Sequence, residues 1–333
     1  MKVLVTGGAG YIGSHACVRL IESGYEVVVI DNLSNSSKQT IQRIETLTKT
    51  KITFYKTDIR NDVELEEIFK RHQFDVIYHF AGLKSAGESY SEPLMYYDVN
   101  VAGSLSVLQR AIKFEVKRFV FSSSAAVYGK SEQQPQTESA PLEPTSPYGL
   151  SKKTVELILG DTYRSNPKFC FIVLRYYNPV GANASGLIGE NPQTIPTNLQ
   201  PILGEVALSR KQFVEVYGNS YDTPDGTGIR DYIHIEDLIE GHIQALITHF
   251  DDSGLFTYNL GNGNGFSVLE MIDMYSSVSN KEIPFQIAED RHGDIPVSIA
   301  DPTKANTKLN WQAKRTLEDM LGDDWRWRKN NLE

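Results

Sequence analysis

Short runs rich in β-branched residues alternate with longer amphipathic runs through the first half of the chain, and this alternation restricts the possible folds most. Runs typical of buried strands cover 2–7, 26–31, 52–58, 74–81, 118–124 and 169–177. The segments between them predict helices over 11–24, near 38–49, over 62–72, over about 93–115 and after Pro147. Strands that alternate with helices form parallel βαβ units. The sequence therefore predicts an α/β fold built on a doubly wound parallel sheet.

The second half of the chain has a different texture. Gly, Pro and Asn become frequent in 178–202 and 217–230, while helical patterns remain at 196–210 and 235–250. This change predicts a smaller, loop-rich C-terminal lobe, and 333 residues suffice for one large or two moderate domains. We expect residues 1–178 to bind a nucleotide cofactor and residues 179–333 to bind the substrate, with the chain free to return to the first domain in places.

Composition excludes several classes of partner. The formal net charge of −9 argues against nucleic acid, because phosphate backbones need a basic face. No apolar run approaches the ~20 residues that span a bilayer, and the N-terminal apolar run is too short for a signal peptide. Cys17 and Cys170 have no spacing typical of a disulfide framework or a metal site. His242 and His249 on one helix would lie ~10 Å apart. We therefore expect a cytoplasmic protein without a metal ion.

The first strand runs into the glycine-rich turn "TGGAGYIG", which precedes the first helix. Gly7, Gly10 and Gly13 allow a tight turn and let backbone N–H groups approach a pyrophosphate at a helix N-terminus. This position, between a strand and a helix, is where a Rossmann dinucleotide-binding motif requires it. Asp31 ends the second strand 18 residues after Gly13. A carboxylate there accepts hydrogen bonds from ribose hydroxyls and repels a 2′-phosphate, so the sequence predicts NAD rather than NADP.

The stretch "SPYGLSKK" places Tyr148 and Lys152 four residues apart at the start of a helix. Side chains at this spacing share one helix face, and a nearby cation lowers the pKa of a phenol. Ser124 follows the fifth strand, and ligands of parallel sheets bind beyond the carboxyl ends of the strands. Together Ser124, Tyr148 and Lys152 can remove a proton from an alcohol while hydride leaves its carbon.

With these motifs the sequence resembles the extended short-chain dehydrogenase/reductase family, and within it the UDP-hexose 4-epimerases. The resemblance covers almost the whole chain and includes "VTGGAGYIGSH", "DNLSNS", "HFAGLKSAGES", "SSSAAVYG", "SPYGLSK", "LRYYNPVGA", "NPQTIPTNLQP", "DGTGIRDYIH", "YNLGNGNGFSV" and "RHGDIP". It implies epimerisation at C4 of UDP-glucose and UDP-galactose through a 4-keto intermediate, with transient reduction of a tightly bound NAD.

The resemblance also implies roles for individual residues. Tyr148 acts as the base, Lys152 tunes its pKa and binds ribose, and Ser124 hydrogen-bonds the reacting hydroxyl. The implied cofactor site comprises Gly7, Gly10, Tyr11, Ile12, Gly13, Asp31, Asn32, Leu33, Ser34, Asn35, Ser36, Asp58, Ile59, Phe80, Ala81, Lys84, Ser122, Tyr148, Lys152 and Tyr177. The implied UDP-sugar site comprises Lys84, Ser124, Tyr148, Asn178, Asn198, Leu199, Tyr217, Arg230, Arg291, Asp294 and Ser298. Asn100 is expected to be mainly structural, and a homodimer is expected through the helices near 93–115 and 148–164.

Enzymes with other activities share this fold. Related 4,6-dehydratases carry an Asp-Glu pair, and related decarboxylases a Glu, where this chain has Ala125 and Ala126. Alanines cannot supply the acid and base of those reactions. A 4-reductase that releases its coenzyme after each turnover, and a non-catalytic NAD-sensing protein, stay open. Ser298 is small where hexose-restricted epimerases often carry tyrosine, so UDP-GlcNAc and UDP-GalNAc are also possible substrates.

Overall fold

A seven-stranded parallel sheet forms the centre of the computed structural model, which describes residues 1–131, 133–194, 196–290 and 293–332. The strand order is β10-β6-β5-β4-β1-β2-β3. The strands are β1 (Lys2–Thr6), β2 (Glu26–Asp31), β3 (Thr53–Lys56), β4 (Val76–His79), β5 (Arg118–Ser124), β6 (Cys170–Tyr176) and β10 (Gly254–Leu260). Every neighbouring pair is parallel, which confirms the predicted doubly wound α/β fold.

Each face of the sheet is covered by its own set of helices, because alternate residues of a strand point to opposite faces. Val3 and Val5 of β1 pack in one core with α1 (Tyr11–Glu22), α2 (Lys38–Thr48) and α9 (Ile235–Thr248). Leu4 packs in the other core with α3 (Asp62–Arg71), α6 (Gly103–Lys113) and α7 (Pro147–Ser165). The near-continuous apolar runs of the strands are therefore buried on both sides.

The long helix expected over 93–115 is interrupted. After α4 (Ala86–Ser91), the helical run consists of α5 (Pro93–Tyr96), a π-helical turn over Tyr97–Ala102 and α6. The π turn contains the buried Asn100, whose side chain accepts a hydrogen bond from Leu83 N at 2.7 Å and donates to Ser151 Oγ at 3.0 Å. These contacts tie the turn to the loop after β4 and to α7, which gives a physical reason for the irregular helix.

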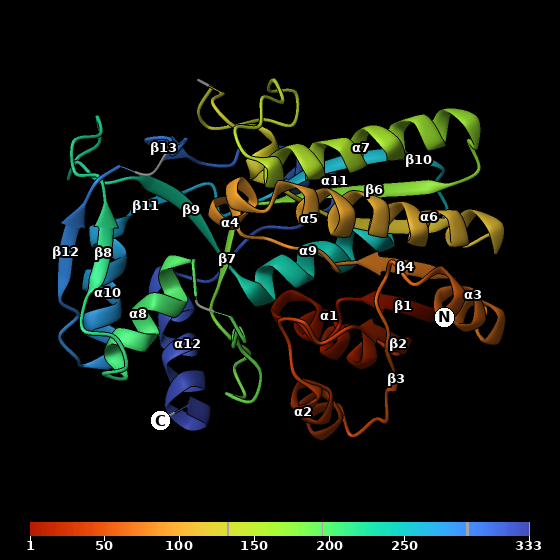
Figure 1. Cartoon of the computed structure of the whole chain (residues 1–333), viewed down its shortest axis with the longest axis horizontal. Coiled ribbons are helices and arrows are strands. Elements are labelled where there is room, and N and C mark those ends of the chain that lie inside the picture. The colour runs from red at the N-terminus through yellow and green to blue at the C-terminus, as the bar shows by residue number, and fades with distance from the viewer. Residues whose placement is uncertain (132, 195, 291–292, 333) are drawn as a thin grey trace.

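The smaller lobe lies beside the central sheet, as Figure 1 shows for β8, β12, α8, α10 and α12. Its strands are β7 (Asn178–Val180), β8 (Val214–Tyr217), β9 (Ile229–His234), β11 (Gly265–Ser267), β12 (Phe285–Ala288) and β13 (Val297–Ser298). Its helices are α8 (Leu199–Ala207), α10 (Val268–Ser279) and α12 (Leu317–Leu332), whereas α11 (Thr303–Lys308) packs against β10 of the central sheet. β9 pairs with β7, β11 and β13, and β8 pairs with β12.

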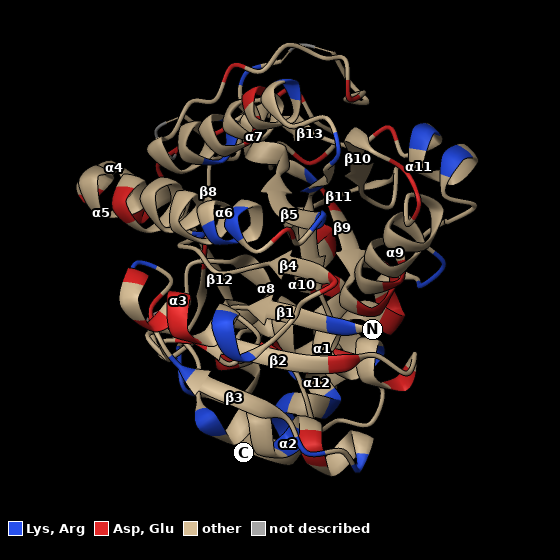
Figure 2. Cartoon of the chain, turned by 90° about the vertical axis from the view of Figure 1, so that its right-hand side faces the viewer, with Lys and Arg blue, Asp and Glu red and all other residues tan. Residues whose placement is uncertain are grey.

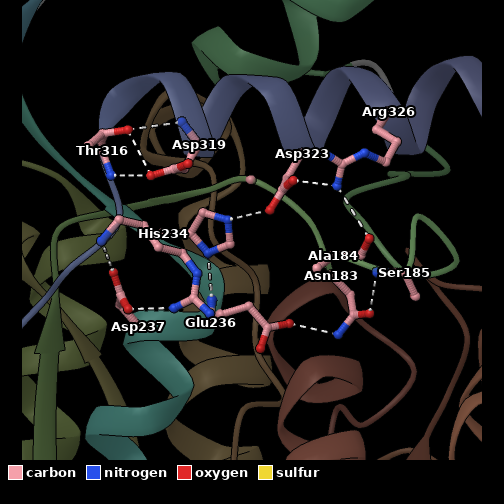
Figure 3. Close-up of polar contacts among 12 residues, drawn as sticks. Asn183, Ala184, Ser185, His234, Glu236, Asp237, Thr316, Asp319, Asp323 and Arg326 are labelled. Carbon is pink, nitrogen blue, oxygen red and sulfur yellow. Dashed lines mark hydrogen bonds and ion pairs between the residues drawn. The ribbon is translucent and has the colours of Figure 1, made fainter.

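The second half of the chain also returns to the central sheet. β10 pairs with β6 as the seventh strand, and α9 packs on α1. Polar contacts fasten α12 to β9 and to the loop after β7 (Figure 3): His234 Nε2 lies 3.3 Å from Asp323 Oδ2, and Arg326, which also donates to Asp323 of the same helix at 2.6 Å, donates to Ala184 O at 3.3 Å. The two halves of the chain are held together by the pairing of β6 with β10 and by side-chain hydrogen bonds such as that from the Tyr11 hydroxyl to Gly181 O at 2.7 Å.

Charges of both signs are interspersed on the surface. Figure 2 shows basic and acidic residues side by side on α3 and α6, where Lys113 pairs with Glu66 at 2.5 Å and Arg110 pairs with Asp62 at 2.7 Å. Such neutralised pairs do not form the basic face that a nucleic acid requires. Among the helices in the described part of the chain, none has both the length and the apolar character needed to cross a membrane.

Candidate active site

The glycine-rich turn packs so closely that side chains cannot fit. Gly7 has a φ of +72°, and a Cβ added there would lie 2.7 Å from Ala81 N. A Cβ on Gly13 would lie 2.2 Å from Gly7 O, so α1 could not approach the turn. The glycines predicted for the cofactor site therefore form a cradle of bare backbone between β1 and α1.

The N-terminus of α1 is open to an anion. Gly10 is the N-cap residue, makes no side-chain capping bond, and no acidic residue stands in the first turn. Uncapped N–H groups and the positive end of the helix dipole attract negative charge. Tyr11 is held in place by a 2.7 Å hydrogen bond from its hydroxyl to Gly181 O, and Ile12 packs against the core. The residues present fit the pyrophosphate of a dinucleotide.

Asp31 lies beside this cradle at the carboxyl end of β2. Its Oδ2 accepts a hydrogen bond from Ala9 N at 3.0 Å, and its Oδ1 accepts from Leu33 N and Ser36 Oγ, both at 2.8 Å. The carboxylate is thereby oriented and joins the turn to the loop over 32–36. Asn32, Ser34 and Asn35 of that loop are exposed. The loop can therefore contact the adenosine side of a nucleotide.

The ends of β3 and β4 complete the predicted cofactor edge. Asp58 accepts a 2.9 Å hydrogen bond from Asn32 and pairs with Arg60 at 2.8 Å, and these contacts hold the pKa of Asp58 well below its usual range. Ile59 is buried, Phe80 and Ala81 are partly buried, and Lys84 is exposed in the loop beyond them. Lys84 forms an ion pair with the buried Glu190. This contact places the segment around Glu190 next to the loop that follows β4.

The predicted catalytic residues meet where β5 ends and α7 begins. Ser146 caps α7 by accepting a hydrogen bond from Gly149 N, and Pro147 occupies the first turn, so Tyr148 and Lys152 stand on adjacent turns. Tyr148 is hydrogen-bonded to Ser124. The buried Lys152 donates from Nζ to Ser122 O at 2.9 Å. The structure therefore brings Ser122, Ser124, Tyr148 and Lys152 together at the carboxyl edge of the sheet.

The protonation of this group is shifted by burial. Burial raises the pKa of Tyr148, and the hydrogen bond with Ser124 partly offsets that rise. Burial lowers the pKa of Lys152 to about 8, against the opposing effect of the Glu156 carboxylate. Lys152 is thus poised to change charge near neutral pH. The expectation that Lys152 lowers the pKa of Tyr148 stays a prediction.

The predicted UDP-sugar residues come mostly from the smaller lobe. Arg230 on β9 forms an ion pair with Asp294, and Ser298 on β13 is the register partner of Arg230. Asn178 donates to Asp231 O at 2.8 Å. Asn198 is the N-cap residue of α8 and makes no side-chain capping bond, Leu199 is the first residue of that helix, and Tyr217 ends β8. Arg291 lies outside the described residues.

The buried Tyr177 donates from its hydroxyl to Gln136 Oε1 at 3.0 Å. Asn100, Glu156 and Glu190 contact site residues or the residues that support them. The sequence pointed only to Asn100 among these three, as a structural residue. Glu156 follows Lys152 by four residues, so the helical period could have revealed it. Glu190 pairs with Lys84 across 106 positions, for which the sequence carries no local signal.

The arrangement combines two chemical functions at one edge of the sheet. A backbone cradle at β1 and an oriented carboxylate at β2 fit a dinucleotide, and a Ser-Tyr-Lys group stands two to three strands away in the same sheet, at β5. A phenol with a hydroxyl partner and a lysine one helical turn away on the same face can exchange a proton with a substrate alcohol. This combination suits reversible oxidation of an alcohol carbon.

Comparisons with known proteins agree with this geometry. Residues 4–323 match the family model described as GDP-mannose 4,6 dehydratase. The UDP-glucose 4-epimerase of Bacillus subtilis (strain 168) is 48% identical over 332 residues, covering 100% of this chain and 98% of the relative. That of Dictyostelium discoideum is 50% identical over 331 residues, covering 99% and 96%. The crystal structure of UDP-glucose 4-epimerase from Bifidobacterium longum in complex with NAD+ and UDP has a TM-score of 0.97 at 44% identity, covering 99% of each chain.

Proposed function

The chain belongs to the family described by the GDP-mannose 4,6 dehydratase model and, within it, to the UDP-glucose 4-epimerases, and we propose that it inverts C4 of UDP-hexoses with NAD as cofactor. This membership confirms the resemblance found in the sequence motifs. The protein is an isomerase: it interconverts UDP-glucose and UDP-galactose. The observation that carries the proposal is the meeting of Ser124, Tyr148 and Lys152 at the sheet edge that also holds the glycine cradle.

Each residue of this group has a defined task. Bound NAD supplies a hydride acceptor that returns the hydride in the same turnover. Tyr148 takes the proton of the 4-hydroxyl group and gives it back, and Ser124 hydrogen-bonds the reacting oxygen. Lys152 places a positive charge beside the phenol, which favours the phenolate. The 4-keto sugar rotates within the site and is then reduced on its other face, which inverts the configuration at C4.

The cofactor and the UDP-sugar are held by different parts of the chain in this proposal. Residues 1–178 supply the glycine cradle, Asp31 and the loop over 32–36, and residues 179–333 supply most of the UDP-sugar site. Arg230 and Arg291 hold the diphosphate, because a dianion needs local cations in a protein of net charge −9. The ion pair of Arg230 with Asp294 orients the guanidinium for this role.

Dehydration, the reaction named in the family model, does not suit this chain. Ala125 and Ala126 form the short 3₁₀ turn directly after β5, beside Ser124. An acid and a base are needed there to remove water across C5–C6. Alanine side chains offer neither, so only C4 chemistry is left to the Ser-Tyr-Lys group.

One experiment separates the epimerase from a reductase or a sensor. The purified protein is denatured and its bound NAD(H) is measured, and the native protein is then mixed with UDP-galactose without added coenzyme. An epimerase yields UDP-glucose and contains close to one NAD(H) per chain. A reductase needs added coenzyme, and a sensor gives no product in either case. Absence of conversion without coenzyme would overturn the proposal.

The proposal extends to N-acetylated substrates. Ser298 is a small, partly buried residue on β13 and the register partner of Arg230. In this proposal it lines the wall beside the C2 substituent of the sugar and leaves room there for an N-acetyl group. We include UDP-GlcNAc and UDP-GalNAc among the substrates on this ground. Turnover of that pair by the wild-type protein tests the extension directly, and no turnover would restrict the enzyme to plain hexoses.

The proposal also includes a homodimer in the cytoplasm. Apolar side chains lie exposed on α5 and α7: Leu94 is 82% exposed, Leu157 58% and Leu150 42%. Exposed apolar side chains grouped on neighbouring helices favour association. Cys17 and Cys170 are buried free thiols, as suits a reducing compartment. Sedimentation of the purified protein tests the dimer, and Leu157→Lys is expected to weaken it.

A further inference from the structure

Three consecutive serines of β5 contact three residues that lie one turn apart on α7. Ser124 is hydrogen-bonded to Tyr148, Ser122 O accepts from Lys152 Nζ at 2.9 Å, and Ser123 Oγ donates to Glu156 Oε1 at 2.5 Å. Tyr148, Lys152 and Glu156 follow each other at intervals of four residues, so they share one face of α7. The contact of Glu156 is therefore part of the same seam that holds the two proposed catalytic residues.

Arg175 holds Glu156 from the neighbouring strand. Arg175 on β6 is the register partner of Ser123 on β5. It donates from Nε to Glu156 Oε1 at 3.0 Å and from Nη2 to Oε2 at 2.6 Å. Its Nη1 donates to Tyr128 Oη at 2.9 Å and to Glu138 O at 3.2 Å, and both members of the ion pair are buried. A two-pronged pair of this kind fixes position as well as charge.

This clamp acts on α7 at the turn after Lys152. Since Glu156 is bonded to adjacent residues of two strands, α7 cannot slide or rotate over the sheet without breaking the pair. A shift of α7 would carry Tyr148 away from Ser124. The Glu156 carboxylate also places a negative charge one turn from the buried Lys152 ammonium, where burial disfavours the charged form.

We propose that Glu156 is a positioning residue for the epimerase reaction: clamped between Ser123 and Arg175, it sets the register of α7 on the sheet and supports the charge on Lys152. The inference rests on the proposed function. It assigns no contact with the substrate or cofactor to Glu156. It differs from a purely structural role in one respect: loss of the carboxylate must change how the activity depends on pH.

The other groups around this seam do not titrate in the range that matters. His79 on β4 lies near Lys152, and burial lowers the pKa of His79 to about 3. Burial raises the pKa of Tyr128 to about 12 and that of Tyr176 on β6 further still. Arg175 stays charged, and Glu138 faces Asn259 N through a 2.8 Å hydrogen bond. Apart from the reacting phenol of Tyr148, Lys152 is therefore the group beside Glu156 whose charge changes between pH 6 and 9.

The test compares Glu156→Gln with Asp324→Asn. Asp324 on α12 is also a buried acid in an ion pair, accepting from Arg328 Nε at 2.8 Å, and it lies outside the proposed site. In Glu156→Gln, we expect kcat to fall roughly 10- to 100-fold with little change in KM, because the reacting groups are displaced. The pH at which activity is lost on the alkaline side should fall by about one unit, because without the Glu156 carboxylate the ammonium of Lys152 loses its proton at lower pH.

In Asp324→Asn, kcat should stay within about threefold of wild type and the pH profile should not move. A pH profile of Glu156→Gln that matches wild type, with bound NAD(H) retained, would overturn the inference. Wild-type protein without epimerase activity would instead refute the proposed function, so the two failures are distinguishable.

A second variant guards against misfolding. Glu156→Gln leaves Arg175 buried without a charge partner, which is strongly destabilising. Glu156→Met combined with Arg175→Met replaces both charges by apolar side chains of similar volume, and such replacements are often neutral for stability. The double variant should fold and still lose activity at lower pH than wild type. A folded double variant with the wild-type profile would also overturn the inference.

Discussion

Replacing Tyr148 by phenylalanine removes one oxygen atom from the proposed active site and leaves the rest of the side chain. The ring of Tyr148 packs edge to face against Tyr96, with centroids 6.4 Å apart and planes at 81°. This contact does not involve the hydroxyl group. The polar interaction that is lost is the hydrogen bond with Ser124, whose Oγ also accepts from Ala126 N at 3.1 Å and so stays partnered.

The effect of Tyr148→Phe on stability should therefore be small. A hydrogen bond contributes about 0.5–1.5 kcal/mol net, and loss of the hydroxyl also removes the cost of keeping that group away from water. About 1 kcal/mol changes the melting temperature by roughly 2–4 °C in domains somewhat smaller than this chain. We expect a melting temperature within about 3 °C of wild type and unchanged NAD(H) content.

The effect on turnover should be much larger. A general acid–base group contributes about 10²–10⁴-fold to the rate, which corresponds to about 3–5 kcal/mol. The predicted loss in kcat thus exceeds any loss in folding free energy. The rate of UDP-glucose formation from UDP-galactose, measured at saturating substrate from pH 6 to 10, checks this difference. Raising the pH should not restore the activity, because no phenol remains to ionise.

Tyr275→Phe provides the matched control. Tyr275 on α10 is a buried tyrosine that donates to Asp324 Oδ2 at 2.7 Å, outside the proposed site. This variant loses a hydroxyl of the same kind, so it should lose stability but keep wild-type turnover. Near wild-type turnover of Tyr148→Phe would refute the assignment of Tyr148 as the base. Equal losses of turnover in both variants would show that the effect is structural.

Three further predictions follow from the same site. In wild type, burial lowers the pKa of Lys152 to about 8, so the ammonium and the activity should both disappear as the pH rises through that value. Lys152→Met should lack this step, and its activity should appear only at higher pH. An unchanged kcat–pH profile would contradict the role of Lys152. In Gly13→Ala the new Cβ would lie 2.2 Å from Gly7 O, so the NAD(H) content per chain should fall strongly. The control Gly322→Ala in α12, whose Cβ would meet nothing within 4 Å, should retain its NAD(H) and gain up to ~1 kcal/mol of stability. Equal cofactor content in the two variants would argue against the glycine cradle. Ser298→Tyr should lose UDP-GlcNAc turnover while keeping UDP-glucose turnover, and retention of both would show that Ser298 does not line the sugar pocket.

Much of the first lobe follows from local patterns in the sequence. The strands over 26–31 and 118–124 have the same bounds in the structure as in the prediction, because continuous β-branched runs bounded by polar turns leave little freedom. The glycine turn and the Tyr148–Lys152 pair were also predictable. A turn with no room for a Cβ at Gly7 and Gly13 and a helical spacing of four residues are both short-range features.

Contacts between distant segments could not be predicted in this way. The sequence offered no sign that 254–260 would become the seventh strand of the central sheet, because its pairing partner β6 lies some eighty residues earlier. The same holds for the ion pairs of Lys84 with Glu190 and of Arg175 with Glu156, whose partners come from different elements. A charged residue carries the same local signal whether it faces water or a buried partner.

The sequence by itself therefore determined the class of fold, the cofactor turn and the chemistry of the Ser-Tyr-Lys group, since each depends on residues close together in the chain. Only the tertiary structure decided that Ser122, Ser123 and Ser124 meet three turns of α7, that Arg175 completes the clamp on Glu156, and that β10 closes the sheet. These features depend on packing between elements, which selects one arrangement from many that the same local patterns allow.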